Sequence, residues 1–161
     1  ARALYGAELP AVFPAEELDR WAAAGTLMGK LKERNLEDTL GGWLKKALPL
    51  RGRRAINYHT NWTYFSAVLG IETAGLIEPK PGIPPSPRDV QKLIETAKTQ
   101  KVDFIFDAPY YEEGKMRRIT ESIGVPYAVL PVFVGDEGAK DFFALMDLTL
   151  DRLLDLVEAR R

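Results

Sequence analysis

One short stretch, 57-NYHTNWTYF-65, carries the side chain with the widest chemical repertoire in the sequence. It holds His59, the only histidine among 161 residues, beside Tyr58 and Trp62. A neutral imidazole binds Zn²⁺ well, and it titrates close enough to neutral pH to act as a general base. A histidine surrounded by aromatic residues can equally be a core side chain. The residue type therefore leaves three roles open for His59: metal ligand, general base or core imidazole.

Carboxylates at two later positions extend this chemistry. Asp107 follows the apolar run that begins 102-VDFIF, and Asp136 and Glu137 follow the run 126-PYAVLPVFV-134. A histidine with a carboxylate suits Zn²⁺ or Mn²⁺. One of each supplies only half of a four-ligand sphere. The ordinary alternatives are a helix N-cap or a surface carboxylate for Asp107, and an exposed turn for the later acidic pair.

The elements around these residues alternate between apolar runs and helical patterns. We expect helices over about 61–69, 86–98 and 110–123 and from about 139 onward, and strands over 53–58, 74–79, 102–109 and 126–134. This order predicts an α/β fold: a four-stranded, mainly parallel, Rossmann-like sheet with helices on both faces. Ligands of such sheets bind beyond the carboxyl ends of the strands, so His59, Asp107 and Asp136 should share one edge.

Two further segments frame this sheet. The run 79-PKPGIPPSP-87 has five prolines and is irregular, and Ser86 with Asp89 predicts a capping box at the next helix. Residues 1–50 lack a strand pattern and are predicted to form a helical linker arm, with helices over 17–34 and 36–48 and a bend or close contact at the glycine pair 41–42. Residues 51–161 are expected to form an α/β lobe that carries the candidate metal ligands. The arm has apolar residues that need a partner surface, namely Leu18, Trp21, Leu27, Leu31 and Trp43.

Composition excludes several classes of function. The net charge of −1 gives no field that would attract nucleic acid, and the absence of cysteine excludes thiol nucleophiles and Cys-ligated zinc. No apolar run is long enough to span a membrane. The sequence also lacks the G-x-S-x-G elbow, the G-x-G-x-x-G fingerprint and the P-loop.

The run 77-IEPKPGIPPSP-87, downstream of the His59 segment, resembles the second lobe of the metal-specific substrate-binding proteins of ABC transporters. These are the zinc- and manganese-binding, adhesin-like proteins of the ZnuA/TroA type. The resemblance extends through 40-LGGW-43, 102-VDFIFDAPYY-111 and 134-VGDEGAKDFF-143, and covers roughly residues 25–160.

The resemblance implies a metal bound between two α/β lobes that a long helix joins. The first lobe usually supplies two histidines, and we expect it to lie outside this chain. His59 matches the ligand at the start of the second lobe's first helix, and Asp107 matches an acidic position near the site. The second ring nitrogen of His59 needs a partner that orients the ring, which could be Tyr64, Tyr110, Tyr111 or Asp107. Leu130, Pro131 and Val132 occupy the place of the usual last acidic ligand, so the fourth ligand is unassigned, with Asp136 a more distant candidate.

The implied function is capture of Zn²⁺, or alternatively Mn²⁺, for an ABC importer, without enzymatic activity. The implied partners are the transporter permease and either the missing N-terminal lobe or a second copy of the chain, in a periplasmic or extracytoplasmic, envelope-associated location. The alternative is a stand-alone α/β regulatory or enzymatic module that uses His59 and Asp107. A phosphoacceptor domain would need acidic residues where 57-NYH-59 stands, and a cobalamin-binding D-x-H-x-x-G run is not matched here.

Overall fold

The computed structural model of the chain describes residues 1–80, 82–111 and 113–159. Its centre is a sheet of four parallel strands in the order β2-β1-β3-β4. The strands are β1 Arg54–Asn57, β2 Glu72–Leu76, β3 Phe104–Asp107 and β4 Tyr127–Val129. The predicted α/β fold with a mainly parallel sheet is therefore confirmed, although β1, β3 and β4 are shorter than their apolar runs and β2 begins at Glu72, two residues before its run.

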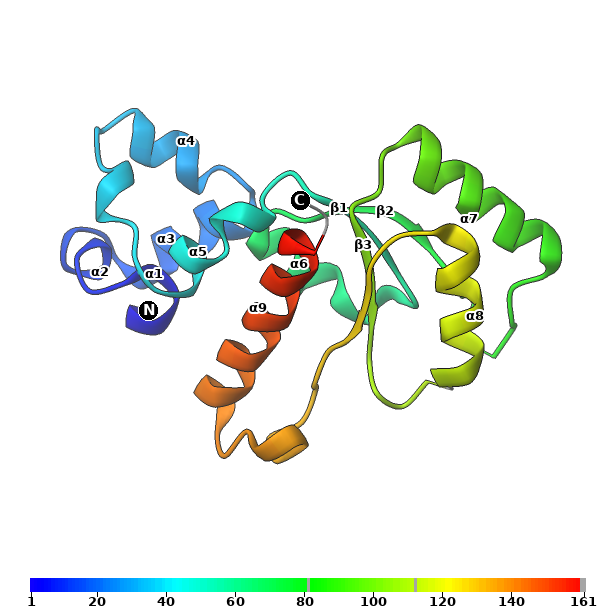
Figure 1. The fold of residues 1–161 in the computed structure, drawn as a ribbon. Helices are drawn as coiled ribbons and strands as arrows, with labels where there is room; N and C mark the ends of the chain where they lie inside the picture. Colours follow the sequence, from blue (N-terminus) through cyan, green and yellow to red (C-terminus); the bar gives the residue numbers. More distant parts are fainter. Residues whose placement is uncertain (81, 112, 160–161) are drawn as a thin grey trace.

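Helices cover both faces of this sheet, as Figure 1 shows. The helices are α6 Thr63–Leu69, α7 Pro87–Thr99, α8 Glu113–Ile123 and α9 Phe142–Glu158. Side chains alternate between the faces of the sheet. Ile56 and Ile105 therefore pack with α7 and α8, whereas Ala55, Phe104 and Phe106 pack with α6 and α9. None of the helices in the described part of the chain is long and apolar enough to cross a membrane.

Local capping chemistry fixes where these helices begin and end. At α7 the hydroxyl of Ser86 accepts from the Asp89 amide while the Asp89 carboxylate accepts from the Ser86 amide, which confirms the predicted capping box. Helix α9 begins at Phe142, later than the sequence suggests, because the Asp141 side chain caps it by accepting from the Ala144 amide. Helix α6 ends at Gly70, which adopts the left-handed conformation.

The arm is helical, but it is not built from the two long helices that the sequence pattern indicates. Residues 17–34 divide into two helices because Gly25 adopts a positive φ of 69°, which interrupts the helix. The arm consists of α1 Arg2–Tyr5, α2 Leu9–Val12, α3 Ala15–Ala23, α4 Leu27–Lys32 and α5 Gly42–Lys46, with 3₁₀ turns η1 Glu37–Thr39 and η2 Leu48–Leu50. No described part of residues 1–50 therefore forms a long rigid helix.

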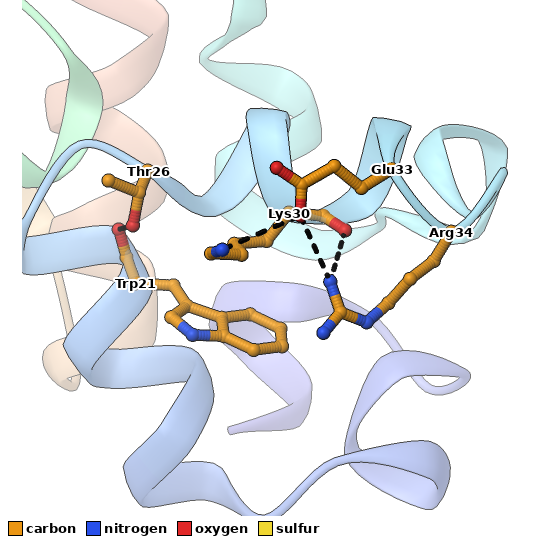
Figure 2. A network of polar contacts seen from close by, with 5 residues as sticks. All are labelled: Trp21, Thr26, Lys30, Glu33 and Arg34. Carbon is orange, nitrogen blue, oxygen red and sulfur yellow. Dashed lines mark hydrogen bonds and ion pairs between the residues drawn. The ribbon is translucent and has the colours of Figure 1, made fainter.

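The apolar residues of the arm find their partner surface within the chain. Leu18, Leu27 and Leu31 are fully buried in the same core as Phe104 and Leu150. Trp21 is partly buried, and the Arg34 guanidinium lies 5.2 Å from its ring centroid. Figure 2 shows this guanidinium near the Trp21 ring, together with the ion pairs of Glu33 with Lys30 and Arg34. The arm is therefore folded against the α/β unit.

The glycine pair of the arm marks a close contact, as expected. Gly41 donates its amide to the Tyr5 carbonyl at 2.8 Å, and a Cβ on Gly41 would lie 2.8 Å from the Gly6 Cα. Gly42 has a φ of 60°, and a Cβ there would collide with the Ala3 carbonyl. Only glycine lets α1 and α5 approach this closely.

Candidate metal centre

Each strand delivers polar residues to the carboxyl edge of the sheet. β1 leads to Tyr58 and His59, β2 to Glu78, β3 ends at Asp107, and the loop after β4 carries Asp136. The parallel order places β1 between β2 and β3, so His59 leaves the sheet from a central strand. Parallel strands converge their carboxyl ends, and this edge is where open α/β sheets hold ligands.

His59 is half-buried and lies at the start of a 3₁₀ turn, η3 Thr60–Trp62. Its Nδ1 accepts a hydrogen bond from the Thr60 amide at 2.8 Å. That amide always donates, so Nδ1 uses its lone pair locally, and Nε2 makes no hydrogen bond within the described residues. The backbone of Thr60, rather than any of the side chains expected to orient the ring, is therefore its partner.

The aromatic residues around His59 divide into core and surface. Trp62 is buried, with its ring centroid 5.6 Å from that of Phe106, and Tyr58 stacks on Tyr111 at 3.8 Å. Tyr64, by contrast, is 87% exposed. The Trp62 and Tyr58 rings are buried in the cores on the two faces of the sheet, whereas His59 is only partly buried.

Asp107 occupies a very different environment, with 1% of its surface exposed. Its Oδ1 accepts from the Tyr127 hydroxyl at 3.0 Å, and its Oδ2 has no hydrogen-bond partner within the described residues. Burial raises the pKa of Asp107 to about 7, and the Tyr127 hydrogen bond opposes that rise. The carboxyl is therefore close to half-protonated at neutral pH.

A second buried carboxylate, Glu78, is one that the sequence patterns did not single out. Its Oε2 accepts from the Tyr58 hydroxyl at 2.7 Å and its Oε1 accepts from the Gly82 amide at 2.6 Å, while only 8% of the residue is exposed. Burial raises the pKa of Tyr58 well above its usual range, and the hydrogen bond to Glu78 adds to this rise. An acidic residue at the end of a strand, just before a proline run, is the signal that could have indicated it.

The acidic residues after β4 take part in the turn itself. Oδ2 of Asp136 accepts from the amides of Val132 and Phe133 at 3.0 and 2.9 Å, and these bonds lower the pKa of Asp136. Glu137 forms an ion pair with Arg152. Within the described residues, no group of three or more His, Cys, Asp or Glu side chains is placed to hold a metal ion.

The chain is similar to solved structures over most of its length. The substrate-binding protein FpvC of Pseudomonas aeruginosa, in complex with Ni²⁺, matches with a TM-score of 0.57 and 24% identity, covering 90% of this chain and 56% of that one. The laminin-binding protein Lbp of Streptococcus pyogenes matches with a TM-score of 0.55 and 18% identity, over 89% and 58% of the two chains. These likenesses establish the fold.

A third structure, the Mn-bound periplasmic metal-binding protein of Candidatus Liberibacter asiaticus, in a mutant form, matches with a TM-score of 0.54 and 15% identity, over 88% and 56%. This chain thus spans somewhat more than half the length of these solved relatives. No curated protein gives a significant sequence match. The family described as zinc-uptake complex component A, periplasmic (ZnuA), matches residues 34–156. The chain belongs to this family.

Proposed function

We propose that this chain is the second, C-terminal lobe of a protein that captures zinc, or alternatively manganese, for an ABC importer. The carrying observation is the placement of His59, which lies just beyond the end of a central strand and is half-buried. Its Nε2 makes no hydrogen bond within the described residues. Membership of a zinc-uptake family supports metal as the cargo. Capture requires no nucleophile, so the proposed role is binding without catalysis.

The donor set within this chain suits part of a metal site. We propose His59 as a direct ligand and Asp107 as the acidic residue of the same edge, with its unpaired Oδ2 as the donor atom. Nδ1 of His59 already accepts from Thr60, so coordination through Nε2 requires the ring proton to move to Nδ1 and that contact to open. We propose that the remaining ligands come from an N-terminal lobe or a second copy of the chain, and that the fourth ligand lies there or on a later loop.

The proposed setting follows from the same family. We propose a periplasmic or extracytoplasmic, envelope-associated protein that delivers its metal to a transporter permease. The alternative of a phosphoacceptor module gains no support, because Tyr58 and His59 follow β1 where such a module needs acidic residues. Sequencing the parent gene tests the setting. A reading frame that encodes neither an upstream lobe nor a signal peptide would contradict it.

Calorimetric titration of Zn²⁺ and Mn²⁺ tests the ligand assignment. We expect weak binding of metal to this chain alone and a loss of about tenfold or more in affinity for His59→Ala. Removal of a residue that only supports a metal ligand already lowers affinity by about tenfold or more, and removal of the ligand itself should lower it at least as much. Tyr64→Ala is the matched control, since Tyr64 is exposed in the same segment and the hydrogen bonds of His59 go to Thr60 instead. Equal affinity in the unaltered chain and His59→Ala would contradict the proposal.

A further inference from the structure

Glu78 is a buried carboxylate outside the proposed ligand set. It follows β2 and is 8% exposed, although a glutamate is rarely buried this deeply unless it is paired. Burial of a carboxylate costs free energy, and hydrogen bonds from its partners offset that cost. One of these partners is Tyr58, which directly precedes His59. A side chain that is costly to bury and is bonded to the neighbour of the candidate ligand points to a role at that site.

Residue 78 holds Tyr58 at two points. The Tyr58 hydroxyl donates to Oε2 of Glu78 at 2.7 Å, and the Glu78 amide donates to the Tyr58 carbonyl at 2.8 Å. The first bond fixes the end of the tyrosine side chain. The second bond fixes the peptide group that joins Tyr58 to His59. Together they restrain the main chain at the point where His59 leaves the sheet.

Two further contacts make this anchor rigid. The Tyr58 ring stacks on that of Tyr111, which lies beyond the end of β3, with 3.8 Å between the ring centroids. Oε1 of Glu78 accepts from the Gly82 amide at 2.6 Å, which ties the carboxylate to the loop after β2. The exits of β1, β2 and β3 are therefore joined at Tyr58 and Glu78. A ligand whose main chain is held in advance loses less entropy when it binds an ion.

The two oxygens of Glu78 allow it to join two donors at once. An apolar side chain at this position would leave the Tyr58 hydroxyl and the Gly82 amide without this acceptor. A glutamine can replace the bridge, because its oxygen accepts from the Gly82 amide while its nitrogen donates to the Tyr58 hydroxyl oxygen. Substitution can therefore separate the bridge made by this side chain from its negative charge.

We propose that Glu78 is a positioning residue for the metal site, which acts through Tyr58 to hold the main chain of His59 at the carboxyl edge of the sheet. This inference rests on the proposed role of His59 as a ligand. Both carboxylate oxygens of Glu78 accept hydrogen bonds within the chain, so it supports the ligand and does not bind the ion itself.

Backbone relaxation measured by NMR at the His59 amide tests the positioning without metal. The unaltered chain should show an order parameter of about 0.85, and Glu78→Ala one below about 0.6. Glu78→Gln should restore the high value. Tyr58→Phe breaks the hydroxyl bond but keeps the Glu78–Gly82 bond, and it should give an intermediate value. A change in global stability alone would leave this amide of the folded chain as rigid as before.

Calorimetric titration of Zn²⁺ connects the anchor to the ion. We expect a loss of about tenfold in affinity for Glu78→Ala, because loss of a residue that supports a ligand has about this effect, and recovery in Glu78→Gln. The double variant Tyr58→Phe, Glu78→Ala should lose no more than Glu78→Ala, since both changes break the same bond. Tyr5→Phe is the matched control. It also removes a buried hydroxyl that donates to a carboxylate, that of Asp19 at 2.5 Å, but in helix α1 of the arm, and it should leave both measurements unchanged.

Several outcomes would overturn the proposal: a rigid His59 amide in Glu78→Ala and Tyr58→Phe, an equal drop in Tyr5→Phe, or a further loss in the double variant. Tyr58→Phe carries the test if Glu78→Ala does not fold. Zinc affinity that falls in His59→Ala but not in Glu78→Ala would also overturn it and leave the ligand assignment intact. If His59→Ala binds zinc as the unaltered chain does, the ligand assignment fails, and the positioning of a ligand fails with it even where the order parameters change.

Discussion

The ends of β1 and β3 meet at one edge of the sheet, yet they hold their polar side chains in opposite environments. His59, two residues beyond β1, is half-buried and accepts one hydrogen bond from its own neighbour at 2.8 Å. Asp107, the last residue of β3, is 1% exposed and has an oxygen without a hydrogen-bond partner in the described part of the chain.

The partly exposed imidazole of His59 is accessible to a metal ion. Burial, by contrast, disfavours the ionised form of the Asp107 carboxyl. An accessible imidazole stays hydrated, so it costs the fold little and can exchange water for metal. A buried carboxyl with a raised pKa gives up stability whenever it ionises without a compensating partner. The contrast therefore predicts that stability depends on Asp107 and metal capture depends on His59.

The largest expected effect on stability is that of Asp107→Asn. The carboxyl has a pKa of about 7 in the folded chain against an ordinary value of 3.8, so between these values the folded chain holds a proton that the unfolded chain has lost. Rising pH through this window therefore lowers the free energy of unfolding, and the full cost is present above pH 7. Asp107→Asn removes this cost, by at most about 4 kcal/mol, since one pKa unit is about 1.4 kcal/mol.

Urea denaturation at pH 5, 6, 7 and 8 measures this effect. The advantage of Asp107→Asn over the unaltered chain should grow from pH 5 to pH 7 and then level off. The matched control is Asp155→Asn, on the exposed side of α9, which should show no comparable trend. An advantage that stays constant across the series would show that Asp107 does not titrate in this window.

A smaller effect is expected for Tyr127→Phe, which removes the 3.0 Å hydrogen bond to Asp107. That bond favours the charged form of the carboxyl, so its loss raises the pKa of Asp107 further. We expect a loss of about 1.5 to 3 kcal/mol in unfolding free energy at pH 8, where the partner is charged, and about 1 kcal/mol at pH 5. Tyr64→Phe, at a residue that is 87% exposed, is the control in the same urea series. A loss that is independent of pH would indicate lost packing alone.

The α/β unit could be predicted from the sequence because its signals are local and agree with one another. Short apolar runs such as 104-FIFD-107 alternate with helices whose starts are marked by caps such as Ser86. The arm was harder to predict, because its pattern is helical throughout while its breaks depend on single residues. Gly25 and Asn35 adopt φ values of 69° and 55°, and packing against the sheet, rather than helix propensity, decides where each short helix ends.

Strand order was enough to place His59 and Asp107 at one edge of the sheet, but burial was not readable from that order. The last residue of a strand can face the rim or the core, and the sheet's alternation turns Asp107 toward Tyr127 on the α7 and α8 face. The Tyr58–Glu78 hydrogen bond joins two strand exits 20 residues apart, a pairing that local patterns do not contain. Whether Asp107 binds metal remains a prediction.

The smallest effect on stability is expected for His59→Ala, and this small effect is the sharpest test of the contrast. The substitution removes one hydrogen bond to the Thr60 amide at the start of a 3₁₀ turn, on a half-exposed residue. Loss of such a cap costs about 1 kcal/mol or less when water can replace the acceptor. Urea denaturation without metal should therefore find the variant nearly as stable as the unaltered chain, while calorimetry finds its zinc affinity reduced. A loss above about 2 kcal/mol would place His59 among buried groups. A small loss of stability together with a large loss of zinc affinity would show that His59 acts in metal binding rather than in holding the fold together.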